Sequence, residues 1–285
     1  MNFDHPQTMG ILNITPDSFS DGGQLYDNEK GAKLNEIEQR VTQMIESGAD
    51  IIDIGGESTG PGSKDVSQND ELERVKSIID LIAEKQSLFS NVQDIDSCLR
   101  RNDSIVFSID TYKAKVAEYA LQIGFEIVND VTALRGDPEM IDVLLKYKPY
   151  VILMYSKDDT PRTTTKTIEY EDVLQTIKDF LTERIEHLTN KGFPREKIII
   201  DPGMGMFVSA NPDYSFEIIE RLNELTNLGC PILIGVSRKS FLGGELKDRD
   251  LDSVKYSLEA IQNGADIVRI HNVKFMSERL SSFYL

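Results

Sequence analysis

The sequence has no tryptophan, and only two cysteines and three histidines occur among its 285 residues. Cys98 and Cys230 lie far apart and have no partner at metal-ligand spacing, so we interpret them as reduced thiols of a cytoplasmic protein. The histidines are scattered through the chain, at His5, His187 and His271. Two distant cysteines do not make a disulfide framework. Because zinc ligands recur at short, regular spacings, a zinc site is not expected either.

Long apolar runs and positive charge are also scarce. No run approaches ~18 apolar residues, which excludes a membrane-spanning helix, and the first ten residues lack the pattern of a signal peptide. The chain has 48 acidic and 31 basic residues, which gives a formal net charge of −17. Such a charge argues against binding to nucleic acid or anionic lipid. Basic residues that cluster after a buried strand are therefore of special interest.

Short runs rich in Ile and Val recur along the chain, separated by amphipathic helical patterns. These runs are typical of buried parallel strands, and they lie at residues 8–14, 50–56, 105–110, 125–131, 150–156, 197–203, 230–237 and 265–272. Eight such strands predict a single (β/α)8 TIM barrel over residues 1–285. The rival is an open doubly wound sheet, although no GxGxxG follows the first strand.

The helical pattern before the second strand ends in Gly-Ala-Asp, and the same tripeptide precedes the last strand. We expect Gly48 and Gly264 to end these two helices. In the first helix one apolar face is predicted, made of Leu34, Ile37, Val41, Met44 and Ile45.

Polar residues follow the predicted strands. In a barrel of parallel strands, the loops after the strands carry the chemistry, so these residues should gather at one end. They include Asn13, Thr59, Asp110, Asn129, Asp201, Arg238, Lys239, Ser240, Arg269 and His271. The set mixes amides, carboxylates and cations, which is more than the topology requires.

Four of these residues suit a flat heterocycle. Carboxylates and amides accept and donate hydrogen bonds along an edge that alternates N–H, NH2 and C=O groups. Lys239 could donate to a ring carbonyl beside them. The alternative is that Asp110, Asn129 and Asp201 only cap helices and bond loop backbones.

Arg269 and His271 are separated by one residue on the last strand, so their side chains point the same way. A guanidinium and an imidazole together could hold a pyrophosphate, and the Asn13 carbonyl could bind Mg²⁺ nearby. The alternative for His271 is a core histidine bonded to a loop carbonyl.

The segment 13–23 after the first strand is rich in turn residues and in side-chain oxygens, including Asp21. It is interpreted as a lid that closes over a reacting centre, or else as an ordinary surface loop. Residues 55–63 after the second strand have the same character.

Seven segments carry a resemblance to a known family. They are, in order, "MGILNITPDSFSDGG", "DIIDIGGEST", "SIDTYKAKVA", "VND", "DPGMG", "GVSRKSF" and "VRIH". Over nearly the whole chain the sequence resembles the dihydropteroate synthases. The resemblance implies an enzyme that joins 6-hydroxymethyl-7,8-dihydropterin diphosphate to 4-aminobenzoate and releases pyrophosphate, with Mg²⁺ as cofactor. Family members are often homodimers through their late helices and are the targets of sulfonamides.

The resemblance also implies roles for single residues. The pterin ring would be bound by Asp110, Asn129, Asp201 and Lys239, and the diphosphate by Arg269 and His271. Ser240 and the backbone amides of a helix beginning there would receive the 4-aminobenzoate carboxylate, with positive potential from Arg238. Mg²⁺ would bind at Asn13, and Thr59 corresponds to the family's loop-two threonine. The implied catalytic residues are Arg269, His271, Lys239 and Asp21.

The chain departs from the family pattern at a few positions. Gly60 stands where arginine is usual, so an anion contact is missing or comes from Arg135 or Arg162. Met206 occupies the usual phenylalanine position and Phe207 follows it, which is similar to sulfonamide-insensitive synthases. Further departures are Tyr155 in place of histidine and Asn272 in place of aspartate.

Two other functions stay open. A pterin-dependent methyltransferase that serves corrinoid proteins would share the barrel and the pterin-binding groups, although "SRKSF" with this first loop is not expected there. A non-catalytic or altered-substrate paralogue would agree with Gly60 and with the changed loop at Met206 and Phe207.

Two segments have open roles as well. Residues 84–103 are interpreted as a surface elaboration or a partner module, and residues 158–167 as a loop that orders over substrate or is disordered.

Overall fold

The computed structural model describes residues 1, 3–15, 25–27, 31–90 and 105–283. Asp21, most of the predicted lid and residues 91–103 of the long connection lie outside these ranges. Within them, residues 84–90 continue the second helix.

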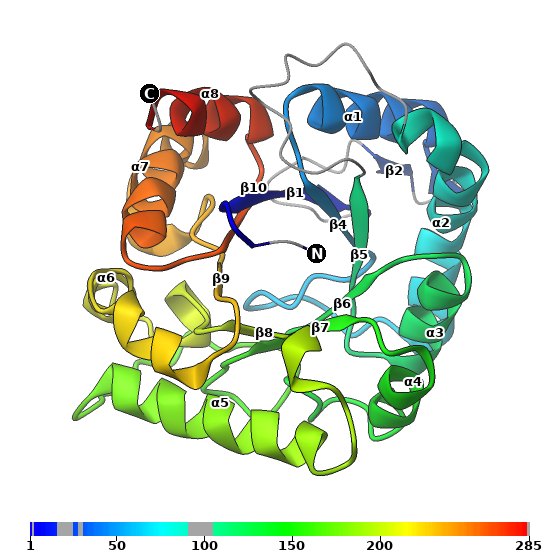
Figure 1. The fold of residues 1–285 in the computed structure, drawn as a ribbon. Helices are drawn as coiled ribbons and strands as arrows, with labels where there is room; N and C mark the ends of the chain where they lie inside the picture. Colours follow the sequence, from blue (N-terminus) through cyan, green and yellow to red (C-terminus); the bar gives the residue numbers. More distant parts are fainter. Residues whose placement is uncertain (2, 16–24, 28–30, 91–104, 284–285) are drawn as a thin grey trace.

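Eight parallel strands form one sheet that curls into a barrel (Figure 1). They are β1 (Gln7–Asn13), β4 (Ile51–Gly55), β5 (Val106–Asp110), β6 (Ile127–Asp130), β7 (Tyr150–Met154), β8 (Ile198–Asp201), β9 (Leu233–Ile234) and β10 (Ile267–Ile270). Their order is β8-β7-β6-β5-β4-β1-β10-β9. A parallel bridge between Ile200 and Ile232 joins the two ends of this order. The predicted TIM barrel is confirmed, and the open doubly wound sheet is excluded.

Helices surround the sheet (Figure 1). They are α1 (Leu34–Glu46), α2 (Gln68–Ser90), α3 (Ala114–Gln122), α4 (Met140–Tyr147), α5 (Val173–Thr189), α6 (Asp213–Glu220), α7 (Arg249–Gln262) and α8 (Val273–Phe283). A small antiparallel pair, β2 (Tyr26–Asp27) and β3 (Gly31–Ala32), precedes α1 and was not predicted. None of the described helices is long and apolar enough to cross a bilayer.

The predicted apolar face of α1 is confirmed except at its first residue. Ile37, Val41, Met44 and Ile45 are buried, whereas Leu34 is 37% exposed. Leu34 is the first residue of α1, and the buried residues of this face begin at Ile37. The predicted helix ends are also correct, because Gly48 and Gly264 follow α1 and α7 with φ of 89° and 105°, a conformation that favours glycine.

One apolar layer fills the interior of the barrel near the start of the strands. Each strand contributes one residue, and the eight are Met9, Ile51, Val106, Ile127, Ile152, Ile199, Leu233 and Ile267. A larger apolar core lies between the sheet and the helices. Apolar side chains therefore fill the barrel at the N-terminal ends of the strands, and a polar site can lie only toward their C-terminal ends.

Candidate active site

The site is built on the next interior layer of the barrel. Side chains alternate along a strand, so the residue two positions after each member of the apolar layer also points inward. These residues are Ile11, Asp53, Ser108, Asn129, Met154, Asp201, Gly235 and Arg269. Five of the eight are polar, so the interior changes from apolar to polar within one step along the strands.

A cavity of about 170 Å³ lies above this layer. Its walls are formed by Ile11, Thr59, Asp110, Asn129, Val131, Met154, Asp201, Phe207, Gly235, Ser237, Lys239, Arg269 and His271. The four residues proposed for a heterocycle come from four different strand ends and line this one space. The predicted convergence of these side chains is confirmed.

A second cavity of about 240 Å³ shares part of the same wall. It is lined by Asn13, Thr15, Glu57, Ser58, Thr59, Gly60, Asp110, Ser237, Arg238, Leu246, Arg269 and His271. Because Thr59, Asp110, Ser237, Arg269 and His271 line both spaces, the two cavities form one site. Asn129, Asp201 and Lys239 line only the first cavity, and Asn13, Glu57 and Arg238 line only the second.

Arg269 joins two carboxylates at the floor of the site. Its Nε donates to Asp53 Oδ2 and its Nη2 to Asp110 Oδ2, each at 2.7 Å. Burial acts to lower the pKa of Arg269, but the two carboxylates raise it overall. Burial raises the pKa of Asp110 to about 7; Arg269 opposes this rise and Asp53 adds to it.

Asp53 is a site residue that the sequence interpretation missed. It is completely buried, and its Oδ2 accepts from both Arg269 and Asn129 Nδ2, the latter at 3.0 Å. A signal for it was present in "DIIDIGG", since Ile51, Asp53 and Gly55 share one parity on the strand. An aspartate at the inward parity of a buried strand needs a partner.

Lys239 and Asp201 face each other in the first cavity. Lys239 Nζ donates to the Met204 carbonyl at 3.1 Å and lies 5.2 Å from the centroid of the Phe207 ring. Burial lowers the pKa of Lys239 to about 8, although Asp201 opposes this shift. Burial raises the pKa of Asp201, whose Oδ1 accepts the Gly203 N–H at 2.8 Å.

His271 is held by a hydroxyl group and not by the loop carbonyl considered above. Ser237 Oγ accepts the backbone N–H of His271 at 3.1 Å and lies 2.9 Å from its Nδ1. Burial, together with Arg238 and Arg269, lowers the pKa of His271 to about 3. The imidazole is therefore neutral at physiological pH, with one nitrogen fixed by Ser237.

Comparisons with known proteins agree with this geometry. A family model described as "Pterin binding enzyme" matches residues 9–271. The chain belongs to this pterin-binding enzyme family.

Individual relatives match over most of the chain. A dihydropteroate synthase of Streptococcus pyogenes serotype M3 is 39% identical over 272 residues, which cover 93% of this chain and 90% of the relative. A "Probable bifunctional folylpolyglutamate synthase/dihydropteroate synthase" of Haloferax volcanii is 38% identical over 273 residues, which cover 95% of this chain but only 29% of the relative.

A solved structure gives the same result for the fold. The dihydropteroate synthase of Xanthomonas albilineans with 4-aminobenzoic acid superposes with a TM-score of 0.82 at 32% identity, covering 100% of this chain and 94% of that chain. The resemblance seen in the motifs is thus confirmed for the fold and for the family.

Two expectations taken from the family pattern need correction. An α-helix does not begin at Ser240: this exposed residue opens a three-residue 3-10 turn, Ser240–Leu242, and α7 begins at Arg249. The positive potential expected from Arg238 is also largely neutralised, because Asp250 accepts from its Nε at 2.7 Å and from its Nη2 at 3.0 Å.

The two arginines considered as replacements at Gly60 are committed to loop contacts. Arg162 pairs with Glu57 and Asp65, while Arg135 pairs with Asp159 and donates to backbone carbonyls. Neither Arg135 nor Arg162 lines either cavity of the site as the described residues define it, so neither takes the place of a cation at position 60.

The segment 158–167 is ordered and connects loops around the site. The Thr163 N–H donates to the Thr59 carbonyl at 3.1 Å. Lys157, just before the segment, donates to Thr163 Oγ1 at 2.9 Å and also to the Met206 carbonyl. The interpretation of this segment as disordered is therefore wrong. Its hydrogen bond to Thr59 holds the backbone of the loop after β4.

A buried ionic cluster supports the same loop from the other side. Lys113 Nζ bonds Glu71 Oε2 at 2.6 Å and the Val66 carbonyl at 2.7 Å, and it also pairs with Glu57. Lys113 and Glu71 are 6% and 0% exposed. Glu57 is therefore anchored from both sides, which positions Thr59 two residues later.

Proposed function

We propose that this chain is a dihydropteroate synthase, which condenses 6-hydroxymethyl-7,8-dihydropterin diphosphate with 4-aminobenzoate to give 7,8-dihydropteroate and pyrophosphate. The observation that carries the proposal is that Asp110, Asn129, Asp201 and Lys239 line one cavity, which opens beside Arg269 and His271. The close relatives with this activity support it.

The first cavity suits the ring of the pterin. Carboxylates accept the N–H and NH2 groups of the ring edge, and the Asn129 amide can both accept and donate. Protonated Lys239 donates to the ring carbonyl, and burial in the pocket lowers its pKa to about 8. Recognition of the ring therefore depends on charges that are already held in place before the substrate arrives.

The second cavity suits the diphosphate. Among the described residues, Arg269 Nη1 has no hydrogen-bond partner, because the carboxylates take Nε and Nη2. Ser237 can donate its single hydroxyl proton to His271 Nδ1, which places the ring proton on Nε2, where it can be donated to a phosphate oxygen. Both groups would stabilise the charge that develops as the C–O bond to the diphosphate breaks.

The residues also fit a magnesium ion that is held mainly by the substrate. A Cβ atom at Gly55 would lie 3.6 Å from Asn13 Oδ1 and 3.5 Å from Asp110 Oδ2, so glycine keeps these oxygens accessible. No group of three or more metal-ligating side chains occurs among the described residues, and Mg²⁺ commonly uses few protein oxygens together with phosphates. When bound at Asn13, it would neutralise part of the diphosphate charge.

The chain supplies no covalent nucleophile in this proposal. The electron-rich dihydropterin carries the developing positive charge, and the neutral amine of 4-aminobenzoate then attacks the exocyclic carbon. Ser240 is proposed to receive its carboxylate, next to Arg238, which is already paired with Asp250, and Asp21 is proposed to close over the reacting centre. The proposal also places the enzyme in the cytoplasm and predicts a homodimer.

The test is a coupled assay of pyrophosphate release from the pterin diphosphate. Release that depends on 4-aminobenzoate supports the proposal. Methyl transfer from methyltetrahydrofolate without pyrophosphate release would support the methyltransferase alternative, and binding of the pterin without turnover would support the non-catalytic one.

One substitution tests the assignment of Arg269. Arg269→Ala should lower kcat by about 10²–10³, the usual cost of removing one donor to a developing oxyanion. Arg279→Ala, at an exposed position on α8, is the matched control. An unchanged kcat in the Arg269 variant would refute its role.

A further inference from the structure

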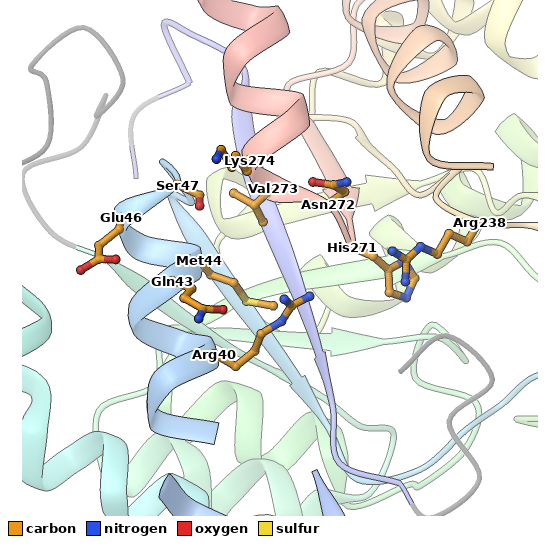
Figure 2. A pocket seen from close by; sticks show the side chains of 10 residues that line it. All are labelled: Arg40, Gln43, Met44, Glu46, Ser47, Arg238, His271, Asn272, Val273 and Lys274. Atoms are coloured by element: carbon orange, nitrogen blue, oxygen red, sulfur yellow. The ribbon is translucent and has the colours of Figure 1, made fainter. Parts of the chain in front are cut away.

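A third cavity extends the site outward between α1 and α8 (Figure 2). Its volume is about 480 Å³, and it is lined by Arg40, Gln43, Met44, Glu46, Ser47, Arg238, His271, Asn272, Val273 and Lys274. Arg238 and His271 also line the second cavity of the site. The third cavity therefore adjoins the place where the diphosphate is expected to lie.

The lining of this cavity is basic in a strongly acidic chain. Arg40 and Lys274 stand against the single carboxylate of Glu46, while Arg238 is already paired with Asp250, in a chain whose net charge is −17. Among the described residues, neither Arg40 nor Lys274 has an ion-pair partner. Cations that lack partners and line a cavity suit an anionic ligand.

The direction of the Arg40 side chain supports the same conclusion. Figure 2 shows Arg40 extending from α1 toward His271, which follows β10. Arg40 is near enough to contribute to the lowering of the pKa of His271, as the smallest of its causes. His271 is 9% exposed, its Nδ1 is held by Ser237, and its Nε2 has no hydrogen-bond partner among the described residues.

The N-terminus of α8 adds backbone donors. Asn272 Oδ1 accepts the Phe275 N–H at 3.2 Å, which caps the helix. The first two residues of the helix, Val273 and Lys274, line the cavity. The amides of a first helical turn favour anions, and here the first two residues of the helix line a space that already holds two cations.

We propose that the cavity between α1 and α8 is a second anion subsite, which receives pyrophosphate as it leaves the catalytic site. Arg40 and Lys274 are its binding residues, and His271 lies between it and the inner site. This inference rests on the proposed function, because the reaction supplies the pyrophosphate.

The test uses inorganic pyrophosphate with the whole chain in the presence of Mg²⁺. Calorimetric titration of the unreacted protein should detect pyrophosphate binding, and steady-state kinetics should give its inhibition constant against the pterin diphosphate. Arg40→Gln and Lys274→Gln should each weaken both by about tenfold, as expected for loss of a charge-assisted hydrogen bond. The KM for 4-aminobenzoate should not change.

Lys191→Gln is the control, because it removes one exposed positive charge at a position beyond the end of α5. Pyrophosphate binding and inhibition that stay unchanged in both variants, or that weaken equally in the control, would overturn the subsite. The titration requires no turnover. If the enzyme released no pyrophosphate from the pterin diphosphate, the proposed function would fail, and the titration would still decide whether Arg40 binds the anion.

Discussion

Asp53 and Arg269 lie 216 residues apart in the chain and form an ion pair of 2.7 Å inside the barrel. Asp53 comes from β4 and Arg269 from β10, with β1 between them. The pair fixes the guanidinium that is proposed to bind the diphosphate, and the same carboxylate oxygen also accepts from Asn129. One buried aspartate thus aligns groups in both halves of the site.

Asp53→Asn should damage catalysis more than any exposed carboxylate would. The amide can still accept one hydrogen bond, but it cannot balance the charge of Arg269, so the guanidinium moves from its aligned position. We expect kcat/KM for the pterin diphosphate to fall by about 100-fold, a typical cost of a small misplacement. Asp142→Asn, on the exposed side of α4, should leave kcat/KM unchanged. Equal kinetics for the two variants would contradict the alignment role.

The pH profile of kcat/KM should be bell-shaped, because it reports ionisations of the free enzyme. Asp110, with its pKa raised to about 7, is protonated below that pH and cannot accept the ring N–H groups. Lys239, with its pKa lowered to about 8, is neutral above that pH and binds the ring carbonyl less well. Activity should therefore rise through about pH 7 and fall above about pH 8.

Lys239→Gln tests the alkaline limb of this profile. The variant should be much less active and should lose the decline above pH 8, while the acid limb persists. Stability provides a second check. Since the folded pKa of Lys239 lies below its ordinary value of 10.5, the folded state holds fewer protons between about pH 8 and 10.5. The wild-type chain should therefore gain stability with pH in that window, and the variant should lack this contribution. A profile that keeps its alkaline limb would assign that limb to another group.

Ser237→Ala should lower kcat by about tenfold, because the His271 ring loses the hydroxyl that fixes its Nδ1. The control is Ser257→Ala, which removes another buried hydroxyl, one with no hydrogen-bond partner among the described residues. We expect that control to keep full activity and at least wild-type stability. If both variants had the same kcat, Ser237 would have only a structural role.

The apolar layer at the base of the barrel should carry stability and not chemistry. Ile152→Ala leaves a cavity in a closed layer, since Ile152 is completely buried. The free energy of unfolding should fall by about 2–5 kcal/mol, measured by urea denaturation, while kcat of the folded fraction stays within twofold. Ile152→Val is the graded control and should cost about 0.5–1.5 kcal/mol. A large loss of kcat without loss of stability would argue against this separation of roles.

The strands and the polar residues that follow them could be predicted from the sequence because both follow from local patterns. Runs of Ile and Val gave eight strands in the correct order, and the polar ends after them gave Asp110, Asn129, Asp201 and Lys239. The partner of each group could not be predicted in this way. Arg238 was expected to add free positive charge, but the return of the chain through α7 brings Asp250 to its guanidinium.

By itself the sequence determined that eight buried strands would present polar ends, because hydrophobicity and side-chain alternation act over neighbouring residues. Only the tertiary structure decided that Asp53 would face Arg269, that Ser240 would begin a turn, and that Arg40 and His271 would line one cavity. Such contacts depend on how the strands are staggered around the barrel and on where distant loops return, and no short stretch of sequence contains that information.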